Sequence, residues 1–213
     1  MSDVVRAVAS DGAATRTRRV AVLLFDEVEV LDFAGPFEVF SVAGRRHGLV
    51  PFDVYTVAER AGPVTARNGL SVNPRHTLAD CPAPDVLVVP GGYGTRREMH
   101  NAPLVEWVGR TARASEVALS VCTGALLLGR AGLLDGLEAT THFGALDLLR
   151  ETAPAARVRD DLRVVDNGAV VLSAGVSAGI DAALHLVARF LGEAHARETA
   201  RYMEYDGRGA WSR

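Results

Sequence analysis

In the middle of the chain stands the stretch Val117-Ala118-Leu119-Ser120-Val121-Cys122-Thr123-Gly124-Ala125-Leu126-Leu127-Leu128-Gly129, in which a strand pattern becomes a helix pattern. Such a turn holds Cys122 at the carboxyl edge of a sheet, and Gly124 permits close backbone approach. The positive end of the following helix favours thiolate over thiol, so the sequence predicts an acidified, nucleophilic cysteine. The alternative is a small buried hydrophobic residue, because free cysteines are usually buried.

Strand and helix patterns alternate on both sides of this turn. Residues 20–25 and 85–89 are continuous apolar runs, as strands covered on both faces require. Further strands are expected at 52–57, 163–165 and 169–172, and an irregular hairpin at 62–72. Helices are expected from about Gly35-Pro36, over 103–114 and 123–131, and over about 178–191 and 193–203. The turn Asp166-Asn167-Gly168 predicts a hairpin. The alternation predicts an α/β domain with a mostly parallel sheet between helices.

Composition narrows the class of protein. The chain has 213 residues, of which 48% are hydrophobic, so we expect one domain over 19–213 and a loose N-terminal extension over 1–18. Two cysteines make no disulfide framework, which favours a reducing, cytoplasmic location. A net charge of −3 gives no electrostatic case for nucleic acid, and no apolar run approaches the roughly 20 residues of a membrane span. The absence of lysine excludes a Schiff base and a P-loop lysine.

Three candidate groups follow predicted strands. Asp32 comes after the first, Gly91-Gly92 after another, and Cys122 after a third. Because ligands of open α/β sheets bind at the carboxyl ends of the strands, we expect these groups to converge.

Four ordered motifs resemble those of the ThiJ/PfpI superfamily, the class I glutamine amidotransferase-like proteins. They are Leu31-Asp32-Phe33-Ala34-Gly35-Pro36, Val88-Val89-Pro90-Gly91-Gly92, Ser120-Val121-Cys122-Thr123-Gly124 and Ala139-Thr140-Thr141-His142. Within the superfamily they most resemble the isonitrile hydratases and the ligand domains of AraC-type regulators. The resemblance covers about 19–205 and implies a flavodoxin-like sandwich and a homodimer.

The resemblance also implies roles for single residues. Cys122 would be the nucleophile and Asp32 the acidic group beside it. Thr123 stands where peptidase-like members have histidine, which argues against proteolysis. The backbone amides at Gly91-Gly92, with that of Thr123, would stabilise an anion or bind substrate.

The implied reaction is hydration of an isonitrile. A thiolate attacks the terminal carbon while a carboxylic acid protonates it, and water then displaces sulfur to give an N-substituted formamide. The hydroxyl of Thr123 could position the water or hold the substrate nitrogen. Neither a metal nor an organic cofactor is expected.

Two other functions compete with hydration. One is a sensor domain like those of AraC-type regulators; here the chain ends at Arg213, which we expect leaves no room for a DNA-binding region. The other is a glyoxalase-like or deglycase-like enzyme, against which Asp32 counts because those relatives favour glutamate there.

Plainer interpretations remain for several residues. Asp32 could cap a helix, and Thr123 could be an ordinary first-turn residue. His142 could be a base or could only close a strand. We interpret Cys81 as structural and Asp181 as complementing a helix dipole. The remaining histidines show no metal-ligand spacing, so no metal site is predicted.

Overall fold

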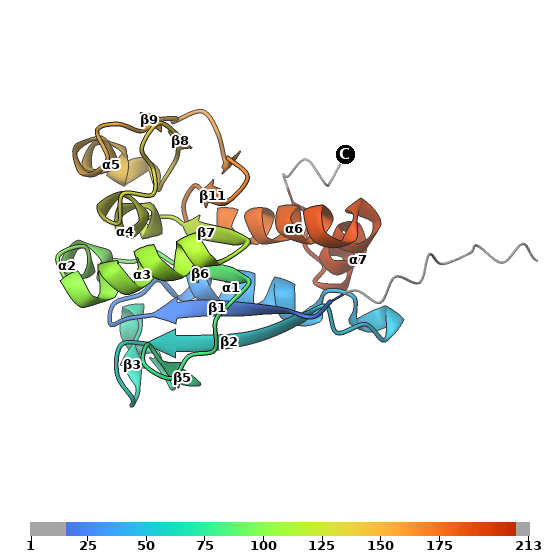
Figure 1. Cartoon of the computed structure of the whole chain (residues 1–213). Coiled ribbons are helices and arrows are strands. Elements are labelled where there is room, and N and C mark those ends of the chain that lie inside the picture. Colours follow the sequence, from blue (N-terminus) through green and yellow to red (C-terminus); the bar gives the residue numbers. More distant parts are fainter. Residues whose placement is uncertain (1–15, 208–213) are drawn as a thin grey trace, which may run out of the picture.

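The computed structural model describes residues 16–207, and a seven-stranded sheet forms its centre (Figure 1). Along the sheet the strand order is β10-β11-β7-β6-β1-β2-β5. Neighbouring strands are parallel, except that β10 and β11 form an antiparallel hairpin at one edge. The bounds are β1 Arg18–Leu24, β2 Phe52–Ala58, β5 His76–Thr77, β6 Val86–Val89, β7 Val117–Val121, β10 Val164–Asp166 and β11 Val170–Ser173.

Helices cover both faces of this sheet. Helices α1 and α6 pack against each other, and α3 lies on the opposite side of the strands (Figure 1). The helices are α1 Val30–Val42, α2 Thr95–Glu98, α3 Ala102–Ala114, α4 Gly124–Arg130, α5 Leu146–Thr152, α6 Ala178–Leu191 and α7 Glu193–Tyr202. The predicted α/β sandwich with a mostly parallel sheet is therefore confirmed.

Short elements complete the described part of the chain. One small sheet pairs β3 (Val64–Thr65) with β4 (Ser71–Val72), at the place where an irregular hairpin was predicted. A second pairs β8 (Glu138–Ala139) with β9 (Arg157–Val158). Single 3-10 turns occur at Arg45–His47, Arg67–Gly69 and Phe143–Ala145.

The central strands are apolar because helices cover them on both faces, as the sequence predicted. All residues from Val20 to Leu24 are fully buried in β1. The hairpin at Asp166-Asn167-Gly168 is confirmed as well: Gly168 has a φ of +83° and its N–H donates to the carboxylate of Asp166 (2.7 Å).

The start of α1 differs from the prediction. The helix begins at Val30, five residues before Gly35, and Pro36 lies inside it. Proline is commonest in the first turn of a helix, which explains the late prediction. The earlier start places Asp32 within the first helical turn, and the N-cap position belongs to Glu29, whose side chain makes no capping hydrogen bond.

The N-terminal end of the described chain is held against the edge of the domain by β1 and by ion pairs. Residues 1–15 of the predicted extension lie outside the described residues, and Arg18 already belongs to β1. Arg16 forms ion pairs with Asp85 and Glu116. Within residues 16–207, none of the helices combines the length and apolar character that crossing a bilayer requires.

Candidate active site

The predicted turn at Cys122 is present between β7 and α4. Cys122 has a φ of +55°, a region that residues with a side chain seldom occupy and that often marks functional sites. Its N–H lies 3.2 Å from the carbonyl oxygen of Ser173 and 3.1 Å from that of Ala174. Its own carbonyl accepts a hydrogen bond from the hydroxyl of Thr141 (2.7 Å). These contacts hold the strained turn in place.

Gly124 explains how the turn fits against the neighbouring strand. A Cβ atom at this position would lie 2.0 Å from the carbonyl oxygen of Val89, at the end of β6. Only glycine allows this approach, as the sequence suggested.

Asp32 lies at the same edge and is completely buried. Its Oδ2 accepts a hydrogen bond from the N–H of Gly91 (3.0 Å), while Oδ1 is buried without a nitrogen or oxygen partner among the described residues. Burial raises the pKa of this carboxyl group to about 7, although the bonds from Gly91 and from the Cys122 thiol oppose the shift. The carboxyl group therefore changes its protonation state near neutral pH.

The thiol of Cys122 does not have the low pKa that the turn predicted. Burial, followed by the charge of Asp32, raises its pKa to about 12, while the backbone N–H groups of Thr123 and Val176 act in the opposite direction. The prediction of an acidified thiol is wrong because it relied on the helix end and did not count the lost hydration, which is the largest cause of the shift.

Val176 is a site residue that the sequence analysis missed. It lies in the loop between β11 and α6, has a φ of +50°, and directs its N–H toward the sulfur of Cys122. Together the amides of Thr123 and Val176 form an anion-stabilising pair at the sulfur. The available signal was a glycine, Gly175, between an apolar strand and a helix, which matches the pattern before α4.

The glycine amides are placed differently from the prediction. The N–H of Gly91 holds Asp32, and that of Gly92 donates to the hydroxyl of Thr123 (3.0 Å). This hydroxyl in turn donates to the carbonyl of Gly92 (3.1 Å) and contacts the hydroxyl of Thr95 (3.1 Å). In this structure the amides of Gly91 and Gly92 and the hydroxyl of Thr123 therefore fix the turn and the carboxyl group, and their hydrogen bonds are made within the protein.

A small cavity of 210 Å³ opens over the cysteine. It is lined by Glu29, Arg67, Gly92, Tyr93, Arg96, Cys122, Thr123, His142 and Val176. His142 is half-buried, stacks on the exposed ring of Phe143, and accepts a hydrogen bond from the N–H of Gly144 at Nδ1 (3.1 Å). The structure thus brings His142 to the mouth of the site, where its other ring nitrogen has no hydrogen-bond partner among residues 16–207.

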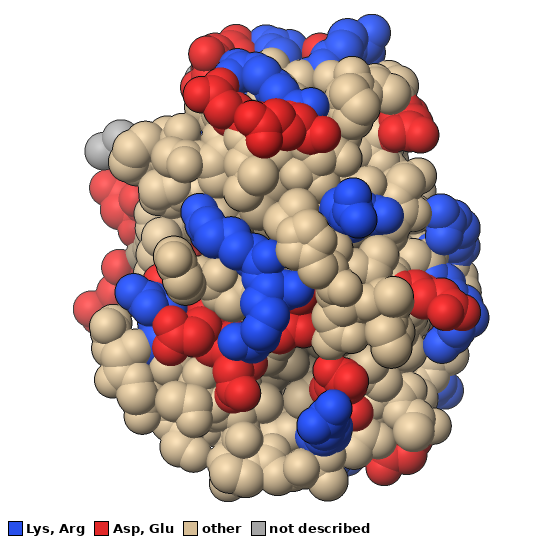
Figure 2. Space-filling model, turned by 90° about the vertical axis from the view of Figure 1, so that its left-hand side faces the viewer, with Lys and Arg blue, Asp and Glu red and all other residues tan. Residues whose placement is uncertain are grey.

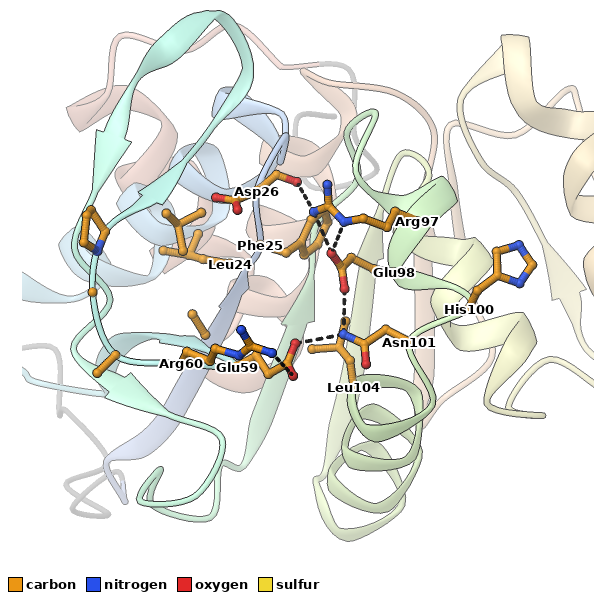
Figure 3. Close-up of a pocket in the computed structure, with 15 residues that line it drawn as sticks. Leu24, Phe25, Asp26, Glu59, Arg60, Arg97, Glu98, His100, Asn101 and Leu104 are labelled. Atoms are coloured by element: carbon orange, nitrogen blue, oxygen red, sulfur yellow. Dashed lines mark hydrogen bonds and ion pairs between the residues drawn. The ribbon is translucent and has the colours of Figure 1, made fainter.

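A larger cavity of 750 Å³ lies beside the site but contains none of these groups. Its polar side chains bind one another (Figure 3): Arg97 pairs with the buried Glu98, and Asn101 donates to Glu98 (2.9 Å) and Glu59 (2.8 Å). Since neither cysteine lies in it, its size does not make it the better candidate for a reactive site.

Two further residues have structural surroundings. Cys81 precedes β6 and is half-buried, and its thiol donates to the carbonyl of Pro82 (3.2 Å). Asp181 is buried in α6 and accepts hydrogen bonds from Arg163 (2.5 Å) and Tyr205 (3.2 Å). The ion pair with Arg163 therefore explains how a carboxylate can be buried here, in addition to the predicted interaction of Asp181 with the helix dipole.

One cluster of potential metal ligands lies away from the cysteine. It consists of His47, His195 and Glu198, each of which offers one ligand atom within 4.8 Å of the others. Because nearly 150 residues separate His47 from the other two, local spacing could not reveal it.

Comparison with known proteins shows the family to which the chain belongs. A family model described as DJ-1/PfpI matches residues 18–189. The chain belongs to the DJ-1/PfpI family. An isonitrile hydratase of Pseudomonas putida is 38% identical over 187 residues, which cover 88% of this chain and 78% of that protein.

A regulator and a solved structure are also similar to this chain. The transcriptional regulator CdhR of Pseudomonas aeruginosa is 35% identical over 167 residues, 78% of this chain but 49% of the regulator. The crystal structure of a ThiJ/PfpI family protein from Pseudomonas syringae superimposes with a TM-score of 0.81 at 30% identity, covering 97% of this chain and 85% of that one. Membership of the family therefore establishes the fold. The activity has to be inferred from the residues of the site.

Proposed function

We propose that this chain hydrates an isonitrile to an N-substituted formamide, with Cys122 as nucleophile and Asp32 moving the proton. The observation that carries the proposal is the pairing of a buried carboxyl group, with a pKa of about 7, with a thiol on a strained turn. Perturbed titratable groups of this kind concentrate at catalytic sites. The 38% identity to an isonitrile hydratase supports the same reaction.

The raised pKa of the thiol changes how the first step begins. At neutral pH the thiol holds its proton, and the ionised fraction of Asp32 serves as general base. Sulfur attacks the terminal carbon of R–NC as Asp32 accepts the thiol proton. Asp32 then delivers that proton to the same carbon, which gives the thioimidate R–N=CH–S-Cys122.

The second step releases the product. Ionised Asp32 accepts a proton from water, whose oxygen adds to the thioimidate carbon. Asp32 passes that proton to the substrate nitrogen. The carbon–sulfur bond then breaks as the remaining proton of the added water moves to the sulfur through Asp32, and R–NH–CHO leaves. The sum is R–NC plus water, with no oxidation or reduction. The amides of Thr123 and Val176 stabilise the sulfur whenever it carries negative charge.

The mouth of the cavity favours a substrate with an anionic substituent. The guanidinium groups of Arg67 and Arg96 lie over the ring of Tyr93, at 5.7 and 5.2 Å from its centre. Arg67 pairs with Glu27 (2.6 Å), whereas no carboxylate of residues 16–207 lies within ion-pair distance of Arg96. Figure 2 shows arginine side chains gathered near the centre of the face at the carboxyl ends of the strands.

A direct assay tests the proposed reaction. Purified protein is incubated with neutral alkyl and aryl isonitriles and with isonitriles that carry a carboxylate, and formamide is measured by mass spectrometry. We expect formamide that depends on enzyme concentration. Failure to form formamide from any of them would reject the hydratase.

A sensor domain is the second candidate, since the chain is 35% identical to a regulator. It predicts saturable binding of a small molecule without turnover. A deglycase of Pyrococcus abyssi, 26% identical over 131 residues, represents a third possible activity, which a glycated peptide substrate would test. A cytoplasmic location and a homodimer remain part of our proposal, and light scattering of the purified chain tests the latter.

A further inference from the structure

The cluster of His47, His195 and Glu198 joins two distant parts of the chain. His47 lies in the 3-10 turn after α1, and the other two residues lie one turn apart on α7. Nε2 of His47 is 2.5 Å from Oε2 of Glu198. The two imidazole rings meet edge to face, with 5.3 Å between their centres.

A hydrogen bond between His47 and Glu198 accounts for only part of this arrangement. It satisfies His47 and Glu198 but leaves His195, whose Nδ1 is shielded from solvent and has no hydrogen-bond partner among the described residues. Buried polar atoms are nearly always paired, so an unpaired ring nitrogen on a residue of this cluster needs an explanation. A metal ion would supply a partner for a histidine nitrogen that no side chain here provides.

We propose that His47, His195 and Glu198 bind a zinc ion. Two imidazole nitrogens and one carboxylate oxygen are a ligand set that zinc accepts, with water in a fourth position. Zinc bonds of about 2.1 Å separate tetrahedral ligands by roughly 3.4 Å. The ligand atoms already lie within 4.8 Å of one another, so small side-chain rotations close the site. Zinc would replace the proton shared by His47 and Glu198.

The ion would fasten α7 to the turn that follows α1. Of the three ligands His47 is the most exposed, with 54% of its side chain accessible, so an ion can enter from solvent. Calcium and magnesium fit less well, because both prefer oxygen ligands and only Glu198 offers them.

Calorimetric titration of the full chain, freed of metal with a chelator, tests the site. We expect one zinc ion per chain and no heat of binding with magnesium. Replacing His47 with glutamine should weaken zinc binding at least tenfold, and His195→Gln should do the same. The matched control is His76→Gln, since His76 is half-buried against Tyr55 and away from the cluster; it should bind zinc as the parent does.

The thiol of Cys122 is the main alternative binding group for zinc in this chain. Cys122→Ala is therefore titrated in parallel, and it should bind zinc as the parent does. The site is rejected if the parent binds no zinc, or if binding at one ion per chain survives in His47→Gln. That variant changes an exposed side chain and should fold, so its result stands even if His195→Gln is unstable. The outcome is independent of the hydratase assay, because the cluster contains no residue of the cysteine site.

Discussion

Burial controls the chemistry of Cys122 and Asp32 more strongly than the helix end does. Each group lacks water that would stabilise its charged form, so the pKa values of both rise, and the charge of Asp32 raises that of the thiol further. Near neutral pH the pair therefore loses only the first of its two protons, and the reactive form keeps one proton on the thiol beside an ionised carboxylate. A nucleophile with its own base nearby does not require a free thiolate.

Replacing Cys122 with alanine should abolish hydration and leave the fold intact. The variant lacks the attacking atom, so turnover should fall by more than about 10³-fold. Formamide release and circular dichroism measure the two properties. Cys81→Ser is the control and should keep nearly full activity; a severe loss in this variant without unfolding would identify Cys81 as the required thiol.

Asp32 should impose a pH dependence on kcat/KM. Only the ionised carboxyl group accepts the thiol proton, so kcat/KM should rise with pH through about 7 and then level off. Asp32→Asn should lower turnover by about 10²–10⁴-fold and remove the rise. An unchanged pH profile in the variant would assign the titration to another group.

The same carboxyl group should also destabilise the folded protein at higher pH. Its pKa is raised in the folded state from 3.8 to about 7, so the folded state binds more protons between these values. Stability is therefore lost as pH rises through this window, by ~4 kcal/mol at most. We expect Asp32→Asn to melt at a higher temperature than the parent at pH 8 and to match it more closely at pH 4. A lower melting temperature at pH 8 would mean that the carboxylate stabilises the fold.

At the scale of elements, the sequence predicted most of what is continuous along the chain. Apolar runs located the strands that end before Gly91 and Cys122, and helix α6 begins and ends at the predicted residues. The start of α1 was missed because Pro36 is tolerated inside the helix. Val176 and the cluster at His47 were missed because they join the other site groups only through the tertiary fold, which no local periodicity encodes.

Gly91, in the turn after β6, lies where this turn, the start of α1 and the Cys122 turn pack closely together. Substituting it tests how tight this packing is. A Cβ there would lie 2.5 Å from the backbone nitrogen of Thr123 and 2.8 Å from Oδ2 of Asp32. Gly91→Ala should therefore displace both groups, lower stability by about 1–3 kcal/mol and reduce turnover. Denaturant melts and formamide assays measure these changes.

Gly109→Ala is the matched control for that substitution. Its nearest contact would be the flexible end of Arg113, and it lies inside helix α3, where alanine is favoured. It should be neutral or stabilising. Equal behaviour of the two variants would show that the turn after β6 can move aside.

At the scale of the whole molecule, one fold gathers the ends of several strands on a single face, and the loops there decide the function. This accounts for a family in which similar chains are named as a hydratase, a regulator and a deglycase. In this chain the same face presents Arg67 and Arg96 over the cysteine cavity, although the net charge of the chain is −3. Local charge, and not the total, should therefore select the substrate.

Arg96→Gln should lower kcat/KM for an isonitrile bearing a carboxylate by about tenfold, which corresponds to ~1.4 kcal/mol, and leave a neutral isonitrile of equal size within about twofold. The guanidinium is partly exposed, so salt should weaken the parent's preference for the anion and have little effect on the variant. Arg110→Gln is the control. It changes an arginine on α3 that is 66% exposed and pairs with Glu106, and it should not alter the preference for the anionic substrate.

Two outcomes would contradict this role of Arg96. If kcat/KM falls equally for both substrates in Arg96→Gln, the arginine shapes the cavity and does not recognise the charge of the substrate. If it falls for neither, the substituent lies elsewhere and the anionic substrate is rejected, while hydration of neutral isonitriles can still stand.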